Sequence, residues 1–167
     1  MINASPEPNP AIDSKKTKPK SRRRMAREFV LQGLYQWRLA GGTASFIEQQ
    51  LRESERFRLI DAKHFTRLLQ GVLEQVETLQ AQIQPHLDRP LHELSPVESA
   101  ILLLSTFELM HHPEIPYRAI INEAIELART YGGSEGYKYV NGVLDKLAVQ
   151  LRAVEVTAQN VIQNPPT

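Results

Sequence analysis

Two neighbouring histidines are the first side chains in this sequence that could do chemistry, because imidazole nitrogens bind metal ions. His111 and His112 are adjacent, however, and adjacent side chains on a helix point about 100° apart. They cannot hold one metal ion together as a pair four residues apart can. The chain also has no cysteine, so thiolate ligands and thiolate nucleophiles are absent. The histidine pair is therefore predicted to form a polar helix end.

Three glutamates and a glycine pair are the other candidates for catalysis or phosphate binding. Glu123 and Glu126 lie three residues apart on a face expected to be solvated. Nothing near them or near Glu108 in the sequence would shift a carboxyl pKa toward acid or base catalysis. Gly132-Gly133 follows a helical pattern rather than a strand, and the sequence there matches neither GxGxxG nor GKS or GKT. The sequence thus predicts a non-enzyme with no metal site and no cofactor.

A run of positive charge is the most distinctive feature of the chain. Residues 15–28, KKTKPKSRRRMARE, contain eight of its 20 lysines and arginines. From residue 28 onward, 12 basic residues face 17 acidic ones, a net charge of −5, although the whole chain has a net charge of +1. A basic arm is thus attached to a mildly acidic body. Such an arm could solubilise the protein, target it, or bind a polyanion.

The arm is predicted to change from disordered to helical along its length. Residues 1–20 contain four prolines and almost no large apolar side chain, so burial cannot offset the entropy cost of ordering them. Apolar residues then recur every three to four positions over residues 25–37, which predicts a helix that includes the last arginines. A tail needed only for solubility has no reason to continue into an ordered element. Arg23, Arg24 and Arg27 are spaced so that at least two share a helical face.

A candidate for nucleic-acid binding lies in EGYKYV, in the first turns of the last predicted helix. Lys138 stands beside Tyr139. A cation next to an exposed aromatic ring can bind the phosphate and the base of single-stranded nucleic acid. The pair could instead be a core tyrosine beside a solvated lysine, and spacing alone favours that interpretation.

The elements that must position these residues are all predicted to be helices. No segment alternates with the period of two that a half-buried strand shows. We expect a compact bundle of about six to seven helices, in two three-helix halves at residues 21–84 and 91–155, joined by the crossover PHLDRP. The predicted helices cover residues 23–40, 44–52, 65–83, 96–112, 116–131 and 134–152, and a polar tail covers residues 156–167.

A heptad-like seam of apolar residues runs from Phe65 to Ile83, with spacings that alternate between four and three. Such a seam can pack inside a bundle or join two chains in a coiled coil. Because it is shorter than four heptads, the sequence favours the bundle core, and a homodimer remains the alternative.

Two further signals concern the second half of the chain. Ser95, Pro96 and Glu98 form a predicted N-cap, first helical residue and capping-box acid. The helix that follows is apolar nearly all round, so it should lie at the buried centre of this half. Gly142 lies in the middle of the last helix, where a glycine suggests close packing of the backbone against another helix.

The sequence favours the cytoplasm over a membrane or export. No apolar run reaches the roughly 18 residues that a membrane span needs. The first residues lack the apolar core of a signal peptide. The absence of cysteine fits a reducing compartment. We therefore expect a cytoplasmic protein without membrane contact.

Four segments of the chain resemble the NusB family of bacterial transcription antitermination factors: RRRMAREFVLQGLYQW, VESAILLLSTFEL, IPYRAIINEAIELARTYGG and KYVNGVLDKL. The resemblance spans residues 21–152. It implies an all-helical fold of two three-helix subdomains and no catalysis. It also implies binding to the boxA element of nascent single-stranded RNA, together with the small-subunit ribosomal protein NusE. The pair would help RNA polymerase to read through terminators, above all in ribosomal RNA operons.

The resemblance also assigns roles to particular residues. The chain departs from the family pattern at Met25, where relatives often carry a basic residue, and at Glu135 and Tyr139, where they often carry aspartate and phenylalanine. The implied RNA-binding residues are Arg23, Arg24, Arg27, Tyr35, Glu135, Lys138 and Tyr139, and Glu98 is implied to face NusE.

Two other classes of protein remain as alternatives. A non-catalytic interaction protein could dimerise through the seam at residues 65–83 and use its arm as a non-specific polyanion-binding segment. A small helical enzyme is the weaker alternative, because no nucleophile, metal set or cofactor loop is evident in the sequence.

Overall fold

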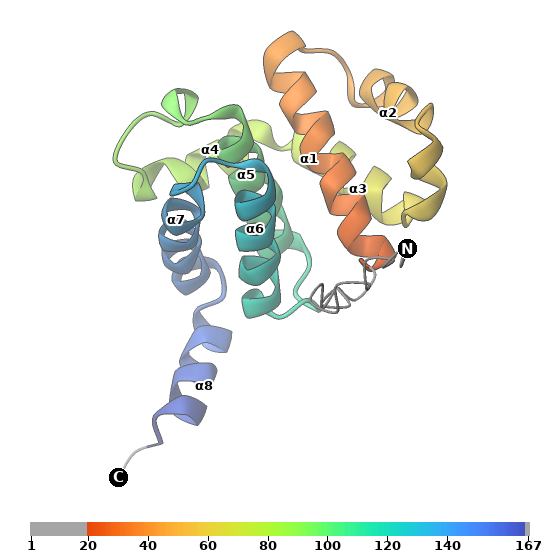
Figure 1. Cartoon of the computed structure of the whole chain (residues 1–167). Helices are drawn as coiled ribbons and strands as arrows, with labels where there is room; N and C mark the ends of the chain where they lie inside the picture. Colours follow the sequence, from red (N-terminus) through yellow and green to blue (C-terminus); the bar gives the residue numbers. More distant parts are fainter. Residues whose placement is uncertain (1–19, 166–167) are drawn as a thin grey trace, which may run out of the picture.

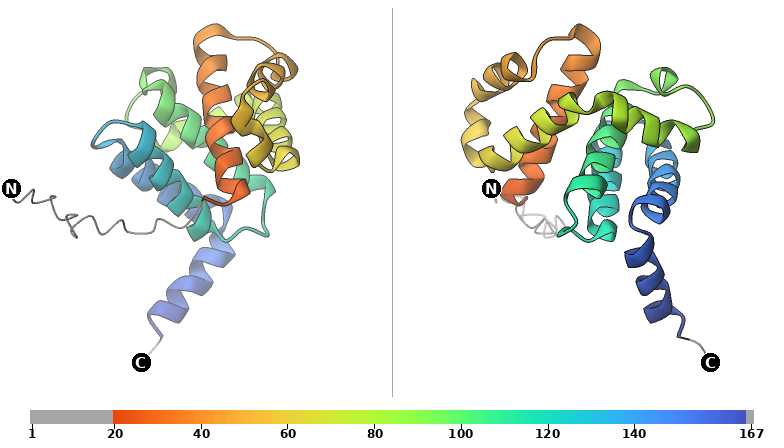
Figure 2. Two further views of the ribbon diagram at one scale, coloured as in Figure 1. Left: turned by 45° about the vertical axis from the view of Figure 1, so that its right-hand side comes forward. Right: turned by 180° about the vertical axis from the view of Figure 1, so that it is seen from behind.

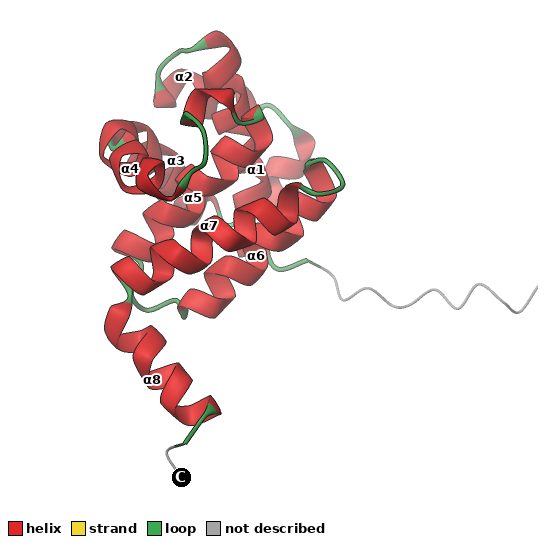
Figure 3. Cartoon of the chain, turned by 90° about the vertical axis from the view of Figure 1, so that its left-hand side faces the viewer, coloured by secondary structure: helices red, strands yellow, loops and turns green. Residues whose placement is uncertain are grey.

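The structure, a computed structural model, describes residues 20–165, and every regular element in this part of the chain is a helix (Figure 3). The predicted all-α class is confirmed. Most of the predicted N-terminal extension, residues 1–19, lies outside the described residues. The α-helices are α1 (Arg22–Ala40), α2 (Ala44–Arg52), α3 (Ala62–Glu74), α4 (Val76–Ile83), α5 (Pro96–His111), α6 (Tyr117–Tyr131), α7 (Gly136–Leu151) and α8 (Ala153–Gln163), and short 3₁₀ helices cover Glu55–Leu59, Gln84–His86 and Leu91–Glu93.

Helix α1 begins inside the arginine run and ends at Ala40, the last residue of the predicted helix. The Ser21 hydroxyl caps the helix by accepting a hydrogen bond from the N–H three residues on, at 3.0 Å. Gly41 ends it with a φ of 71°, in the left-handed region that favours glycine. Near this end, the Arg38 guanidinium donates to the carbonyl oxygen of His92 at 2.7 Å. This contact ties α1 to the crossover between the two halves.

The seam at residues 65–83 forms two helices, α3 and α4, rather than the single predicted helix. Gln75 lies between them with φ −117° and ψ 18°, outside helical geometry. The seam is nonetheless buried within one chain, so the bundle-core interpretation is confirmed and the seam is not available for a coiled-coil dimer. Its fully buried members are Phe65, Leu69, Val72, Leu79 and Ile83.

Helix α5 is the centre of the bundle, as its apolar composition predicts. Every side chain from Ser99 to Leu109 is buried. Helices α1 and α3 pack against α5 from one side, and α6 and α7 pack against it from the other (Figures 1 and 2). Gly71 permits the close approach of α3, because a Cβ atom there would lie 2.2 Å from the Phe107 ring. The two halves therefore share one core.

Arg152 closes the end of α5, where the last carbonyl groups of a helix have no partner within the helix. Its guanidinium is buried and donates to the carbonyl oxygens of Leu109 at 2.7 Å, His112 at 2.8 Å and Ile115 at 3.1 Å. Glu155 accepts from the same guanidinium at 2.7 Å. The residue between α7 and α8 thus fixes the turn that follows α5.

Helices α6 and α7 lie side by side, and one expectation about α7 is wrong. Gly142 does not pack against another helix, because a Cβ atom built there would meet no atom within 4 Å. A glycine inside a helix costs about 1 kcal/mol relative to alanine. Close packing therefore does not explain this glycine.

The predicted polar tail is partly helical. Helix α8 continues to Gln163 and projects away from the bundle (Figure 1). Its apolar side chains Val154, Val161 and Ile162 are exposed, so the tail gains no core contacts from them. Across residues 20–165, none of the helices combines the length and the apolar character of a membrane span.

Candidate nucleic-acid interface

Two exposed arginines at the start of α1, Arg23 and Arg24, form the first predicted RNA-binding patch. This pair is called the α1 patch. Arg23 is the more exposed, and its nearest acid is Asp61 at 3.9 Å. Arg24 lies against α6, with its guanidinium 3.2 Å from Glu123 and 3.7 Å from Glu126. The sequence predicted a solvated face for the two glutamates. In the structure, both pair with an arginine of another helix.

Arg27 differs from its implied role. Its guanidinium is buried and forms a two-pronged ion pair with Glu108, with hydrogen bonds of 2.6, 2.9 and 3.1 Å. The side chains are only 9% and 3% exposed. A guanidinium enclosed in this way joins α1 to α5 and does not belong to the exposed basic surface. Glu108 is likewise occupied by this pair.

The second predicted patch, here called the α7 patch, consists of Glu135, Lys138 and Tyr139. Lys138 is 63% exposed and lies 2.9 Å from the Glu135 carboxylate. The Tyr139 hydroxyl donates to Asp88 at 2.8 Å, and the guanidinium carbon of Arg89 lies 5.3 Å from the centre of the Tyr139 ring. The hydrogen bond from Arg89, and then that from Tyr139, lowers the pKa of Asp88 to about 2. Asp88 is therefore ionised at neutral pH and anchors the tyrosine.

A chain of contacts joins the α1 patch to the α7 patch. Glu126, which pairs with Arg24, also lies 3.8 Å from Arg129. The Arg129 guanidinium lies 4.6 Å from the centre of the Tyr137 ring, and the ammonium of Lys138 lies 5.9 Å from the same ring. Two patches that are more than 100 residues apart in sequence therefore belong to one surface, where cations alternate with an aromatic ring.

Sequence reasoning missed the residues that make this connection. Tyr137 has the spacing of the core stripe of the last helix, but it is only partly buried and lies between two cations. Arg129 follows Glu126 by three residues, a spacing that places both on one helical face and could have indicated the pair. Arg89, which contacts Tyr139 within the α7 patch, was also missed, because it lies in the crossover, where sequence alone predicts no contact.

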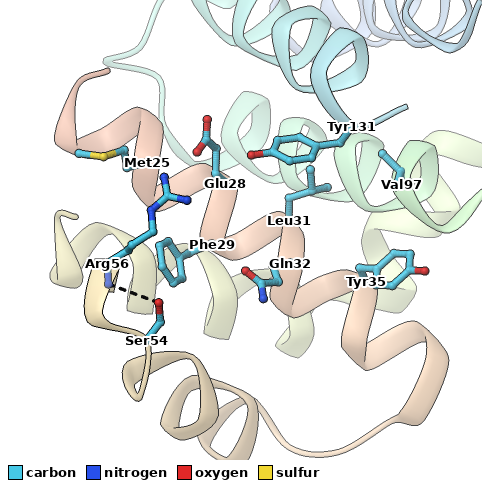
Figure 4. A pocket seen from close by; sticks show the side chains of 10 residues that line it. All are labelled: Met25, Glu28, Phe29, Leu31, Gln32, Tyr35, Ser54, Arg56, Val97 and Tyr131. Atoms are coloured by element: carbon cyan, nitrogen blue, oxygen red, sulfur yellow. Dashed lines mark hydrogen bonds between the residues drawn. The ribbon is translucent and has the colours of Figure 1, made fainter. Parts of the chain in front are cut away.

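An apolar groove of about 430 Å³ runs beside α1 (Figure 4). Tyr35, an implied RNA-binding residue, lines it and is 41% exposed. Tyr131 at the end of α6 faces the same space, and burial raises the pKa of its phenol. Val97, the residue before Glu98 in the sequence, forms part of the lining.

Glu98 connects the start of α5 to the start of α7. The backbone N–H of Glu98 donates to the Ser95 hydroxyl at 3.1 Å, as predicted for an N-cap. A Cβ atom on Gly136 would lie 2.5 Å from a carboxylate oxygen of Glu98, so a larger residue there would displace the end of this side chain. The residue implied to face NusE therefore lies directly beside the α7 patch.

The histidine pair has separate contacts. His112 is buried and lies 2.8 Å from Glu114, whereas the exposed His111 contacts Gln75 at 2.6 Å. Between residues 20 and 165, no group of three or more histidine and acidic side chains could hold a metal ion.

The fold and this surface are those of an all-helical binding protein. The NusB family matches residues 24–149, and the chain belongs to this family. The chain is similar to the transcription antitermination protein NusB of Nitrosomonas eutropha, with 61% identity over 147 residues that cover 88% of each protein. The solved structure of T. maritima NusB has 32% identity and a TM-score of 0.67, and the match covers 75% of this chain and 89% of that one.

One further solved structure supports the fold alone. It contains the antitermination factors NusB and NusE in complex with dsRNA, and its matching chain has 23% identity and a TM-score of 0.66. The match covers 75% of this chain and 95% of that chain.

Proposed function

We propose that the protein is a transcription antitermination factor that binds boxA-type single-stranded RNA together with NusE. In this role it would join the antitermination complex of RNA polymerase and support transcription of ribosomal RNA operons in the cytoplasm. The name of the relative with 61% identity supports the process. The role consists of binding and requires no catalytic group.

The continuous surface from the α1 patch to the α7 patch is the observation that carries the RNA-binding part of the proposal. Arginines supply phosphate contacts and planar groups for stacking, and unstacked bases are read on aromatic side chains. Tyr137 lies between Arg129 and Lys138 on this surface. An RNA strand that follows it would meet cations and an aromatic ring in turn.

The NusE part of the proposal concerns the surface around Glu98. The carboxylate lies beside Gly136, at the edge of the α7 patch, and the preceding residue, Val97, lines the apolar groove at Tyr35. A basic RNA-binding protein would find complementary charge on the mildly acidic body. In this arrangement NusE and RNA bind next to each other, so each can increase the affinity for the other.

Replacing both Arg23 and Arg24 with alanine should weaken boxA binding and make it less sensitive to salt. Each lost phosphate contact reduces the magnitude of the slope of log affinity against log salt by about 0.7, so we expect a change of about 1.4. Fluorescence anisotropy of labelled boxA RNA and a scrambled RNA, with and without NusE, measures this across a salt series.

The matched control removes two arginines outside the connected surface, Arg67 on α3 and Arg118 on α6. This variant has the same net charge and should keep the wild-type slope. If both double variants lose affinity equally, only net charge matters and the arm is a non-specific polyanion-binding segment. If the wild type does not prefer boxA and does not respond to NusE, the proposed function is wrong.

Neutralising the acids that hold Arg24 should have the opposite effect. Glu123 and Glu126 compete with RNA phosphates for this guanidinium. The double variant Glu123→Gln, Glu126→Gln should therefore bind boxA RNA several-fold more tightly at low salt, and the gain should shrink as salt rises. The same anisotropy series tests this, with Glu53→Gln, Glu55→Gln as the equal-charge control. Unchanged binding would show that RNA does not contact Arg24.

A further inference from the structure

The apolar groove of about 430 Å³ beside α1 has aromatic walls. Phe29 and Tyr35 line it from α1, and Tyr131 lines it from the end of α6 (Figure 4). Both tyrosines are partly open to solvent, with exposed fractions of 41% and 47%. Proline-rich segments in an extended conformation bind aromatic-lined grooves of this kind. The groove therefore suits an occupant that is extended, apolar and rich in proline.

The chain enters α1 past the mouth of this groove. The Lys20 ammonium lies 2.6 Å from the carboxylate of Glu28, which lines the groove and has a side chain only 13% exposed. Burial, and next the negative charge of Glu28, raises the pKa of the Tyr131 phenol, and the positive charge of Lys20 partly offsets them. Lys20 is therefore close to both walls, and the residues before it start beside the groove.

The sequence before Lys20 has the composition that this groove suits. Residues 5–12 read SPEPNPAI, with three prolines followed by Ile12. Proline fixes φ at about −65°, so such a segment is already biased toward an extended conformation and loses little entropy on binding. It cannot form a core of its own, but the groove supplies the apolar surface that it lacks. Its one charged residue, Glu7, is complementary to Arg56 in the lining.

The tether between the segment and the groove is long enough and short enough. Ten residues separate Pro10 from Lys20 and span up to about 33 Å when extended. Along α1, the groove residues Glu28 and Tyr35 are only about 10 Å apart. The segment can thus reach the whole groove. A short tether also gives it a high effective concentration there, so a weak contact is sufficient.

We propose that residues 5–12 bind in this groove of the same molecule, with the prolines and Ile12 packed on the aromatic walls. The Lys20–Glu28 ion pair holds the start of the tether at the groove mouth. The contact lies within one chain and goes beyond the proposed function. Because the bound segment covers Tyr35, a partner that uses this tyrosine must first displace the segment.

The absence of cysteine from the chain permits a direct test in the full-length protein. Ala4→Cys creates a single site for a nitroxide label, which broadens the NMR signals of amides close to it. The amide signals of Gln32, Tyr35 and Val97 in the groove should lose most of their intensity. The signals of α4, which lines no part of the groove, should keep theirs.

The matched control is the same labelled chain with the prolines replaced: Pro6→Ser, Pro8→Ser and Pro10→Ser. Its length, charge and label are unchanged, and the three positions lie outside residues 20–165, so the fold should keep its melting temperature. The groove signals should regain most of their intensity. Equal broadening in both chains would mean that the segment passes over the surface without binding, and the proposal would be overturned.

A mixture of two chains tests the other occupant, the segment of a second copy. An isotope-labelled chain without nitroxide is mixed with a nitroxide-labelled chain that gives no NMR signal. Broadening of the groove signals in this mixture would show exchange between molecules and would also overturn the proposal. Unchanged signals support binding within one chain.

RNA binding provides a second readout, which rests on the proposed function. A groove that is occupied half of the time lowers the apparent affinity about twofold, so the triple serine variant should bind boxA RNA at least about twofold more tightly. Recovery of the groove signals without this gain would support the contact and show instead that RNA does not use Tyr35.

Discussion

Replacing Arg27 with methionine should lower the free energy of unfolding by about 3–5 kcal/mol. The substitution leaves the Glu108 carboxylate buried without its partner, and the side chain of Glu108 is only 3% exposed. The lost contact is the bidentate pair that joins α1 to α5. Urea unfolding followed by circular dichroism measures the change, with the slope against urea expected to stay near that of the wild type.

The double variant Arg27→Met, Glu108→Leu is the control for this prediction. It removes both charges and fills the space with apolar atoms, so most of the lost stability should return. A loss below about 1 kcal/mol in the single variant would mean that the pair is solvated in solution, as exposed pairs are. In that case Arg27 would be available to RNA, as the family resemblance implies.

The protein should lose up to about 3 kcal/mol of stability between pH 6.5 and pH 4 through His64 alone. Burial, and next the positive charge of Arg27, lowers the pKa of His64 from 6.5 to about 4. Between these values the unfolded chain binds a proton at His64 and the folded chain does not. The free energy of unfolding therefore falls as the pH falls through this window and levels off below pH 4. Urea unfolding at a series of pH values measures the slope.

His64→Leu isolates this contribution from that of the carboxylates. The imidazole Nε2 is buried without a hydrogen-bond partner, so the apolar replacement should cost little at pH 7. Between pH 6.5 and 4 the variant should show a flatter profile than the wild type. Parallel profiles would mean that His64 titrates normally and that the acid sensitivity arises elsewhere.

Local signals in the sequence predicted the ends of the helices well. Ser95 caps α5 through its hydroxyl, as predicted, and α1 and α2 end at the predicted residues 40 and 52. The break at Gln75 was not predictable, because neither proline nor glycine marks it. Helix α8 was missed since only Val156 among its apolar side chains packs against the core and no side chain caps its start.

The candidate site was predictable in its parts but not in its connections. The resemblance indicated the two patches, whereas only the structure brings Arg24 to Glu126 and Arg129 to Tyr137. One feature of the sequence could have predicted the burial of Arg27. Glu108 is the single charge in an otherwise apolar stretch of α5, and such a charge usually requires a buried partner of opposite sign.

The position of Arg152 has a consequence for the order in which the protein can mature on the ribosome. Leu109, whose carbonyl oxygen accepts from Arg152, is synthesised 43 residues before its donor. At about 5–20 residues per second, this interval lasts roughly two to nine seconds. During this time helices α1 to α5 can pack together, but the carbonyl groups at the end of α5 lack their hydrogen-bond donor, Arg152. The nascent chain can therefore complete its fold only after all of α7 has been made.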